Sequence, residues 1–252
     1  MRPTGTNICE GQIYSMQIKP VLYDDLHPVG PLRHQGKRVF ETGNYTFTRK
    51  AGAVPLTLWE LPEAARSMPT VFLMGDEPGI VALLGLKEGQ NVFVDKRGRW
   101  APHAYIPAYI RRHPFIFARQ DETNFSLWVD ESSDRLNDEK GEKLYEDGKS
   151  TETLQQAIDF CTRYHKEIEA TKLIIKEIAE TGILRDRRTT VTVDGATKFE
   201  LGGFHAIKED ALRDLDKELL LAWHEKGWLQ ACYAHLISMR NLKVLGELSK
   251  DW

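Results

Sequence analysis

The longest regular pattern of apolar positions begins near residue 150 and continues for about eight helical turns. Its apolar residues recur at steps of three, four and seven: Leu154, Ala157, Ile158, Cys161, Tyr164, Ile168, Ile175 and Ile178. These steps place the side chains on one face of an α-helix, because the helix repeats every 3.6 residues. Ser150 or Thr151 suits the start of this helix, and Gly182 suits the left-handed position just past its end.

The apolar period changes after this helix. Residues 189–201 alternate between apolar and polar side chains around an Asp-Gly dipeptide, which is typical of a tight hairpin turn. Helical spacing returns in residues 211–226 and 228–248, with Asp210 as the expected cap and Gly227 as the stop between the two segments. The second half of the chain is therefore predicted to be helical, with one β-hairpin.

The first half has shorter and less regular patterns. β-Branched and aromatic residues bounded by turn formers predict short strands at residues 38–49, 70–75 and 91–95. The apolar run at residues 81–86 fits either a strand or a helical turn. All 11 prolines lie at or before Pro114, and proline disfavours helix interiors. The sequence thus predicts an α+β fold, with a proline-rich β-sheet in the N-terminal half packed against the helical C-terminal half.

A polar stretch at residues 131–150 separates these regions. Its Glu-Lys-Gly and Glu-Asp-Gly turn signals predict a solvated connector with a small hairpin, and it lacks the ligand spacing of a calcium-binding loop. We therefore expect a β-rich region over residues 1–130, this connector, and a helical region over residues 151–252. At 252 residues the chain is long enough to bury a substantial core, and we expect one compact unit.

Charge also differs between the two regions. Residues 1–114 hold 14 basic and 10 acidic residues, whereas the remainder holds 20 and 27, and the whole chain has a net charge of −3. This balance argues against a nucleic-acid binder, which usually carries a basic excess. The start of the chain lacks an apolar run of secretory-signal length, and the three cysteines (Cys9, Cys161 and Cys232) are odd in number and widely separated. A reduced, cytoplasmic protein without a transmembrane segment is expected, with surface association only by a route that needs no cleavable signal.

Residues 100–117 carry most of the candidate chemistry, with two His, two Arg and three Pro set among aromatic residues. One or two helical turns are expected after Pro107, which would make Arg111 and Arg112 project at the rim of the core. Guanidinium groups beside aromatic rings bind carboxylates and stack on the rings, which favours a groove for a peptide or an acidic ligand. The candidate ligand-binding residues are Trp100, His103, Tyr105, Tyr109, Arg111, Arg112 and His113.

A structural role is the competing interpretation of the same residues. The aromatic side chains would then fill the core, while Arg111 or Arg112 pairs with an acidic residue of the helical half. Patterns for metal, nucleotide or nucleophile sites are missing: there is no HExxH pair, no Cys/His cluster, no glycine-rich phosphate loop and no nucleophile elbow. We therefore predict no metal and no cofactor.

Three segments, at residues 85–100, 105–117 and 233–245, resemble the SapC family, and the helix and hairpin of residues 151–204 fit the same outline. The resemblance covers roughly residues 12–246. It implies a bacterial protein of a family named after a gene of a surface-array locus. Related genes lie near cupin-type oxygenases, tryptophan-halogenase-like flavoproteins and TonB-dependent receptors. The resemblance supplies no set of catalytic residues.

The favoured function is a non-enzymatic accessory or binding protein for peptide or cell-surface modification or for surface-layer function. Its expected partner is a peptide or protein, such as a modifying oxygenase or a halogenase-like enzyme, and no nucleic acid. The alternative is a metal-assisted or oxidoreductase-like enzyme that acts on peptides and uses His103, His113 and nearby carboxylates. His113 stands where members of the resembled family often carry an aromatic residue, which argues against a family-wide role for this imidazole.

Overall fold

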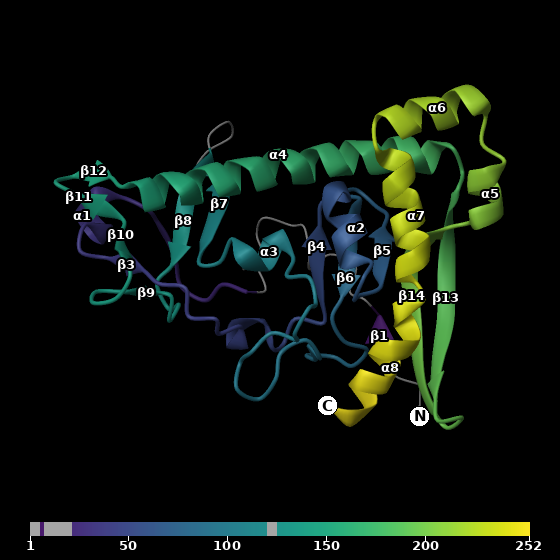
Figure 1. The fold of residues 1–252 in the computed structure, drawn as a ribbon, viewed down its shortest axis with the longest axis horizontal. Helices are drawn as coiled ribbons and strands as arrows, with labels where there is room; N and C mark the ends of the chain where they lie inside the picture. Colours follow the sequence, from purple (N-terminus) through teal and green to yellow (C-terminus); the bar gives the residue numbers. More distant parts are fainter. Residues whose placement is uncertain (1–5, 8–21, 120–124) are drawn as a thin grey trace.

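The fold is organised along one long helix, α4 (Glu152–Glu180), which extends over most of the length of the molecule (Figure 1). The computed structural model describes residues 6–7, 22–119 and 125–252, so Cys9 and most of the first 20 residues lie outside the described residues. Small sheets lie at one end of α4, and a larger sheet with the C-terminal helices lies at the other end (Figure 1). The elements confirm the predicted α+β class.

The signals that predicted α4 are confirmed. The Thr151 side chain caps the helix by accepting a hydrogen bond from the Leu154 N–H at 3.4 Å. Gly182 takes a left-handed φ of 72° just past the end of the helix. The buried residues of α4 lie on the expected apolar face: Leu154, Cys161, Tyr164, Ile168, Thr171, Ile174, Ile175 and Ile178.

The larger sheet has six strands in the order β1–β14–β5–β6–β4, with β13 also paired to β14. Its strands are β1 (Thr6–Asn7), β4 (Ala53–Leu56), β5 (Thr70–Leu73), β6 (Gly79–Leu83), β13 (Leu184–Val193) and β14 (Thr197–Ile207). The predicted hairpin is confirmed and extends beyond residues 189–201, because Gly203, at φ 75°, lets β14 pass a bulge and continue to His205, which pairs with Phe72 of β5. The N-terminal and C-terminal regions thus contribute strands to one sheet.

Three small sheets lie under the first half of α4. They are formed by β2 (Leu26–Pro28), β7 (Phe115–Arg119) and β8 (Phe125–Asp130), by β3 (Arg38–Val39), β9 (Leu136–Asn137) and β10 (Glu142–Lys143), and by the hairpin of β11 (Tyr145–Glu146) and β12 (Lys149–Ser150). This last hairpin is the one predicted in the polar connector. Side chains of these sheets form a core with Leu154 and Cys161 of α4, separate from the large core on the six-stranded sheet.

Two strand predictions in the first half are wrong, and each segment contains a side-chain hydrogen bond to the backbone that favours a turn. The strand expected at residues 38–49 is limited to β3, because Asn44 Oδ1 accepts from the Thr46 N–H at 3.0 Å and starts the short helix η1 (Thr46–Thr48). Residues 91–95 form no named strand: Asn91 Oδ1 accepts from the Phe93 N–H at 2.9 Å, and Val94 forms only an isolated antiparallel bridge with Trp100. The ambiguous run at residues 81–86 is largely the strand β6.

The C-terminal helices are α5 (Glu209–Arg213), α6 (Lys217–Glu225), α7 (Trp228–Ser238) and α8 (Asn241–Asp251). The helix expected over residues 211–226 is interrupted, because Asp216 rather than Asp210 caps α6 by accepting from the Glu218 N–H at 2.8 Å. Gly227, at φ 75°, ends α6 as predicted. No helix among the described residues combines the length and the apolar composition needed to cross a membrane.

The remaining helices are short and lie in the first half: α1 (Pro31–His34), η2 (Leu58–Glu60), α2 (Leu61–Ala64) and α3 (Ala108–Arg111). Helix α3, a single turn, confirms the short helix of one or two turns predicted after Pro107. In the described part of the chain Cys161 and Cys232 are both free and buried. Burial raises the pKa of the Cys161 thiol to about 11 and that of Cys232 to about 12, so both thiols stay protonated.

Candidate functional site

Helix α3 is held in place by a buried carboxylate from another segment. One oxygen of Glu60, at the end of η2, accepts hydrogen bonds from the Ala108 N–H at 2.6 Å and the Tyr105 hydroxyl at 2.9 Å. The other oxygen accepts from the Thr57 N–H at 2.8 Å. Three donors therefore satisfy Glu60, and this carboxylate fixes the start of α3 against η2.

The seven residues predicted to bind a ligand do not form one surface. Tyr105 and Arg111 lie on an open side of α3, whereas Tyr109, Arg112 and His113 point into the protein. Trp100 packs against Tyr45 and Phe93, with ring centroids 5.6 Å and 5.7 Å away. His103 is exposed in a turn and has a left-handed φ of 63°.

Arg112 does not project at a rim, so this part of the prediction is wrong. Its Cζ atom lies 4.3 Å from the ring centroid of Tyr109, 4.8 Å from that of Tyr164 and 5.7 Å from that of Tyr23. Burial raises the pKa of the Tyr23 and Tyr109 hydroxyls, which stay neutral while the guanidinium stays charged. Arg112 is thus enclosed by tyrosine rings, because neighbouring residues of a helical turn point about 100° apart.

His113 belongs to the interior and to a polar network beneath it. Its ring stacks on Phe47 at 3.9 Å between centroids, and its Nε2 lies 3.6 Å from Asp130 Oδ2. Burial lowers the pKa of His113. Asp130 also accepts hydrogen bonds from the N–H groups of Asp24 at 2.8 Å and Asp25 at 2.9 Å, which together with His113 lower its pKa despite burial. This network ties β8 to the segment before β2.

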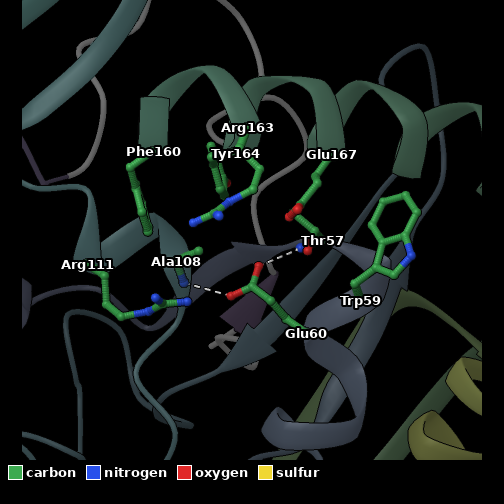
Figure 2. A pocket seen from close by; sticks show the side chains of 9 residues that line it. All are labelled: Thr57, Trp59, Glu60, Ala108, Arg111, Phe160, Arg163, Tyr164 and Glu167. Carbon is green, nitrogen blue, oxygen red and sulfur yellow. Dashed lines mark hydrogen bonds between the residues drawn. The ribbon is translucent and has the colours of Figure 1, made fainter. Parts of the chain in front are cut away.

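A pocket opens between α3, η2 and the middle of α4, on the side of Arg111 (Figure 2). Its volume is about 310 Å³, and its lining residues are Thr57, Trp59, Glu60, Ala108, Arg111, Phe160, Arg163, Tyr164 and Glu167. Arg111 is the only one of the seven predicted residues among them. Trp59 is 51% exposed at the mouth of the pocket.

Two guanidinium groups flank one aromatic ring in this pocket. The Cζ atoms of Arg111 and Arg163 lie 5.4 Å and 5.6 Å from the ring centroid of Phe160, so they are at most about 11 Å apart. Figure 2 shows both groups pointing into the same space from α3 and α4. Among the described residues, no carboxylate lies within ion-pairing distance of Arg111, Arg112 or Arg163. The alternative in which Arg111 or Arg112 pairs with an acidic residue of the helical half is therefore not seen in the described part of the chain.

Arg111 is oriented by two hydrogen bonds. Its Nε donates to the Ile106 carbonyl oxygen at 2.9 Å, and its Nη2 donates to the Tyr105 hydroxyl at 3.1 Å. Burial, followed by the nearby charge of Glu60, raises the pKa of Tyr105 to about 12. The hydroxyl therefore stays protonated, donates to Glu60 and accepts from Arg111. This chain of contacts holds the guanidinium at the pocket before any ligand is present.

Among the described residues, no group of three potential metal ligands includes His103 or His113, which the metal-assisted alternative would use. Within the described ranges, one group of three potential ligand atoms lies within 4.8 Å of one another, from Asp25, His27 and Glu131. Glu131 is already paired with Arg33, and this pairing lowers the pKa of Glu131 to about 2. A cation at this position would have to displace the Arg33 guanidinium, so an ion-pair network describes these residues better.

Sequence reasoning missed the pocket because its residues come from three segments. The α4 residues of the pocket, Phe160, Arg163, Tyr164 and Glu167, recur at steps of one, three and four, and thus share one side of the helix. The sequence signal for the pocket was therefore this row of aromatic and charged residues beside the apolar face of α4. Trp59 and Thr57 had no such signal, since only the fold brings η2 beside α4.

Comparison with known proteins gives one match. A family model described as SapC matches residues 31–245, which is most of the chain and includes α3, η2, α4 and every residue of the pocket. The comparison with curated proteins and the comparison with solved structures each returned no match.

Proposed function

Since the chain belongs to the SapC family, we propose that it is a non-enzymatic binding protein that holds an acidic peptide segment for a peptide- or surface-modifying system. The observation that carries this proposal is the pair of guanidinium groups, Arg111 and Arg163, around the ring of Phe160. The partner enzyme would be an oxygenase or a halogenase-like protein, and the bound segment would be its substrate or its docking sequence.

Electrostatics favours a carboxylate between the two arginines. Two like charges at most about 11 Å apart repel by at least roughly 0.4 kcal/mol in water, and by more where the pocket excludes water. A ligand carboxylate near Phe160 removes this repulsion and gains charge-assisted hydrogen bonds from both planar groups. Glu60 does not compete as the counter-ion, because three donors already satisfy it.

The rest of the pocket suits a peptide. Trp59 and Phe160 offer aromatic surface to the apolar part of a side chain, and Glu167 offers an acceptor for a peptide N–H or an amine. A volume of about 310 Å³ is at the small end of ligand sites and matches one acidic residue with its neighbours. The pocket is open to solvent, so a longer chain can pass through it and stay accessible to an enzyme.

Calorimetric titration with two short peptides that differ only in Glu against Gln tests the proposal. We expect the Glu peptide to bind more tightly, and Arg111→Gln or Arg163→Gln to weaken its binding by roughly tenfold, which corresponds to about 1.4 kcal/mol. Arg97→Gln, which removes an exposed arginine outside the pocket, is the matched control and should leave the affinity unchanged.

Thermal unfolding of each variant checks that the fold is retained. Equal binding of the Glu and Gln peptides would overturn the proposal, and so would a folded Arg111→Gln, Arg163→Gln double variant that binds like the unmodified protein. Equal weakening by Arg97→Gln would show that the effect comes from net charge rather than from the pocket.

A further inference from the structure

A second apolar surface lies on the outer face of α7 and α8, far along the chain from the pocket residues. Its members are each between 43% and 60% exposed: Tyr233, Ile237, Val244, Leu248 and Trp252. The steps of four place Tyr233 and Ile237 on one side of α7 and Val244 and Leu248 on one side of α8, and Trp252 directly follows α8. Met239 (φ −60°, ψ −22°) and Arg240 (φ −66°, ψ −25°) between the two helices keep right-handed helical dihedrals. We call these five residues the α7–α8 stripe.

The opposite face of the same helices is fixed to the protein, so the stripe cannot be covered by turning the helix. A Cβ atom on Gly246 would lie 2.7 Å from Val191 of β13, which shows how closely α8 approaches the sheet. Ser249 Oγ accepts from the Leu86 N–H at 3.1 Å, and the Ser249 carbonyl oxygen accepts from Gln90 Nε2 at 2.9 Å. In Figure 1, α7 and α8 follow the length of β13 and β14. The exposed apolar residues therefore stand on a rigid support.

Charged residues of both signs border the stripe. Arg240, Lys243 and Glu247 are exposed, and none of them forms an ion pair with another of the described residues. Positions three and four apart on a helix are neighbours, so these side chains lie beside Val244 and Leu248. A surface of this kind needs a partner that offers apolar residues in the middle and opposite charges at the same spacing.

We propose that the α7–α8 stripe packs antiparallel against the same stripe of a second copy, forming a two-fold homodimer. A two-fold axis between Lys243 and Val244 sets Arg240 of each copy opposite Glu247 of the other, so the pairing forms twice. The apolar members then meet along the axis, and the buried area is apolar at its centre and charged at its rim. A parallel arrangement would instead set Arg240 against Arg240 and Glu247 against Glu247.

A lipid surface fits the stripe less well than a second copy does. Interfacial helices carry Lys and Arg on their polar faces, whereas this one also exposes Glu247 and Asp251, in a chain of net charge −3. The dimer uses charges of both signs and needs no basic excess.

Analytical ultracentrifugation of the full chain over a concentration series tests the inference. We expect a reversible dimer, and we expect Ile237→Glu to shift the protein to a monomer at concentrations up to about 100 μM. Leu173→Glu is the matched control, because Leu173 is 63% exposed on α4, outside the stripe, and this change should leave the dimer intact. Thermal unfolding verifies that each variant is folded.

Charge reversal separates the proposed pairing from general loss of apolar area. Arg240→Glu and Glu247→Arg should each raise the dissociation constant of the dimer by at least roughly tenfold. The double variant should restore the dimer. A monomeric wild-type chain would overturn the inference, as would a dimer that survives Ile237→Glu. If a monomeric wild type binds anionic vesicles and Ile237→Glu abolishes this binding, the stripe is a membrane surface and the inference is wrong.

Discussion

Arg111 and Arg112 are neighbours in the chain, yet their guanidinium groups lie in opposite environments. Arg111 is exposed at a pocket, where two hydrogen bonds hold it and the ring of Phe160 is its wall. Arg112 is enclosed by the rings of Tyr23, Tyr109 and Tyr164. The same residue type thus lines a pocket on the open side of α3 and packs among tyrosine rings on the closed side.

This difference shows that one helical turn directs the side chains of a mixed aromatic and basic segment into two different environments. On the closed side, cation–π contacts stabilise the charge without a described carboxylate within ion-pairing distance, so the tyrosines and the long arginine stem form part of the packing. On the open side, the charge of Arg111 remains available to a ligand. Glu60 contributes to both sides, because its hydrogen bonds to Tyr105 and Ala108 set the orientation of the turn.

The largest expected effect is the difference in stability between two alanine variants. Arg112→Ala removes a long side chain from among three rings, and we expect the free energy of unfolding to fall by about 4 kcal/mol. Arg111→Ala removes an exposed side chain, and we expect a loss of less than about 1 kcal/mol. Chemical denaturation of both variants measures the two values. Equal losses would mean that Arg111 on the open side and Arg112 on the closed side contribute equally to the free energy of unfolding.

The second effect is a loss of stability in acid. Burial lowers the pKa of His113 on the closed side, and it lowers the pKa of His235, on the buried face of α7, to about 4. Both histidines bind fewer protons in the folded chain than in the unfolded chain, where the pKa is about 6.5. Their contribution to stability is therefore complete above pH 6.5 and is lost as the pH falls through the folded values. Protonation of His235 alone accounts for about 3 kcal/mol.

Replacing His113 by Phe isolates the closed-side part of this acid effect. The new ring can keep the stack on Phe47 and has no proton to bind, so the difference in unfolding free energy between pH 7 and pH 5 should become smaller. Chemical denaturation at the two pH values measures the change. An undiminished difference would show that His113 does not contribute to the acid effect, and the His235→Gln variant would then be expected to reduce it.

The elements that were predicted correctly have signals within a few residues of one another. The period of α4, its cap Thr151 and its end at Gly182 are local features, and so is the Asp-Gly turn between β13 and β14. The wrong strand predictions at residues 38–49 and 91–95 have a local reason in common, since an asparagine side chain in each segment accepts a hydrogen bond from the backbone two residues further on and favours a turn.

The site was predictable only in part, because its geometry depends on contacts between distant segments. Arg111 was identified from its aromatic surroundings in the sequence. Arg163 and Trp59 were not, since they join Arg111 only when η2, α3 and α4 pack together. Arg112 was predicted to lie at a rim because it is an arginine next to Arg111 in the same aromatic segment. The rotation of about 100° between successive helical residues instead directs its side chain inward.

The smallest expected effect concerns the preorganisation of the open side. Tyr105→Phe removes the hydroxyl that links Glu60 to Arg111 and leaves the ring in place. We expect the affinity for the Glu peptide to fall by roughly threefold, because Arg111 keeps its bond to the Ile106 carbonyl but loses one of its two fixed partners. The stability of the variant should change by less than about 1 kcal/mol. Calorimetric titration and denaturation of the same preparation measure both quantities. If Tyr105→Phe leaves the affinity for the Glu peptide unchanged while Arg111→Gln lowers it, then Phe160 and the Ile106 carbonyl suffice to orient the guanidinium on the open side.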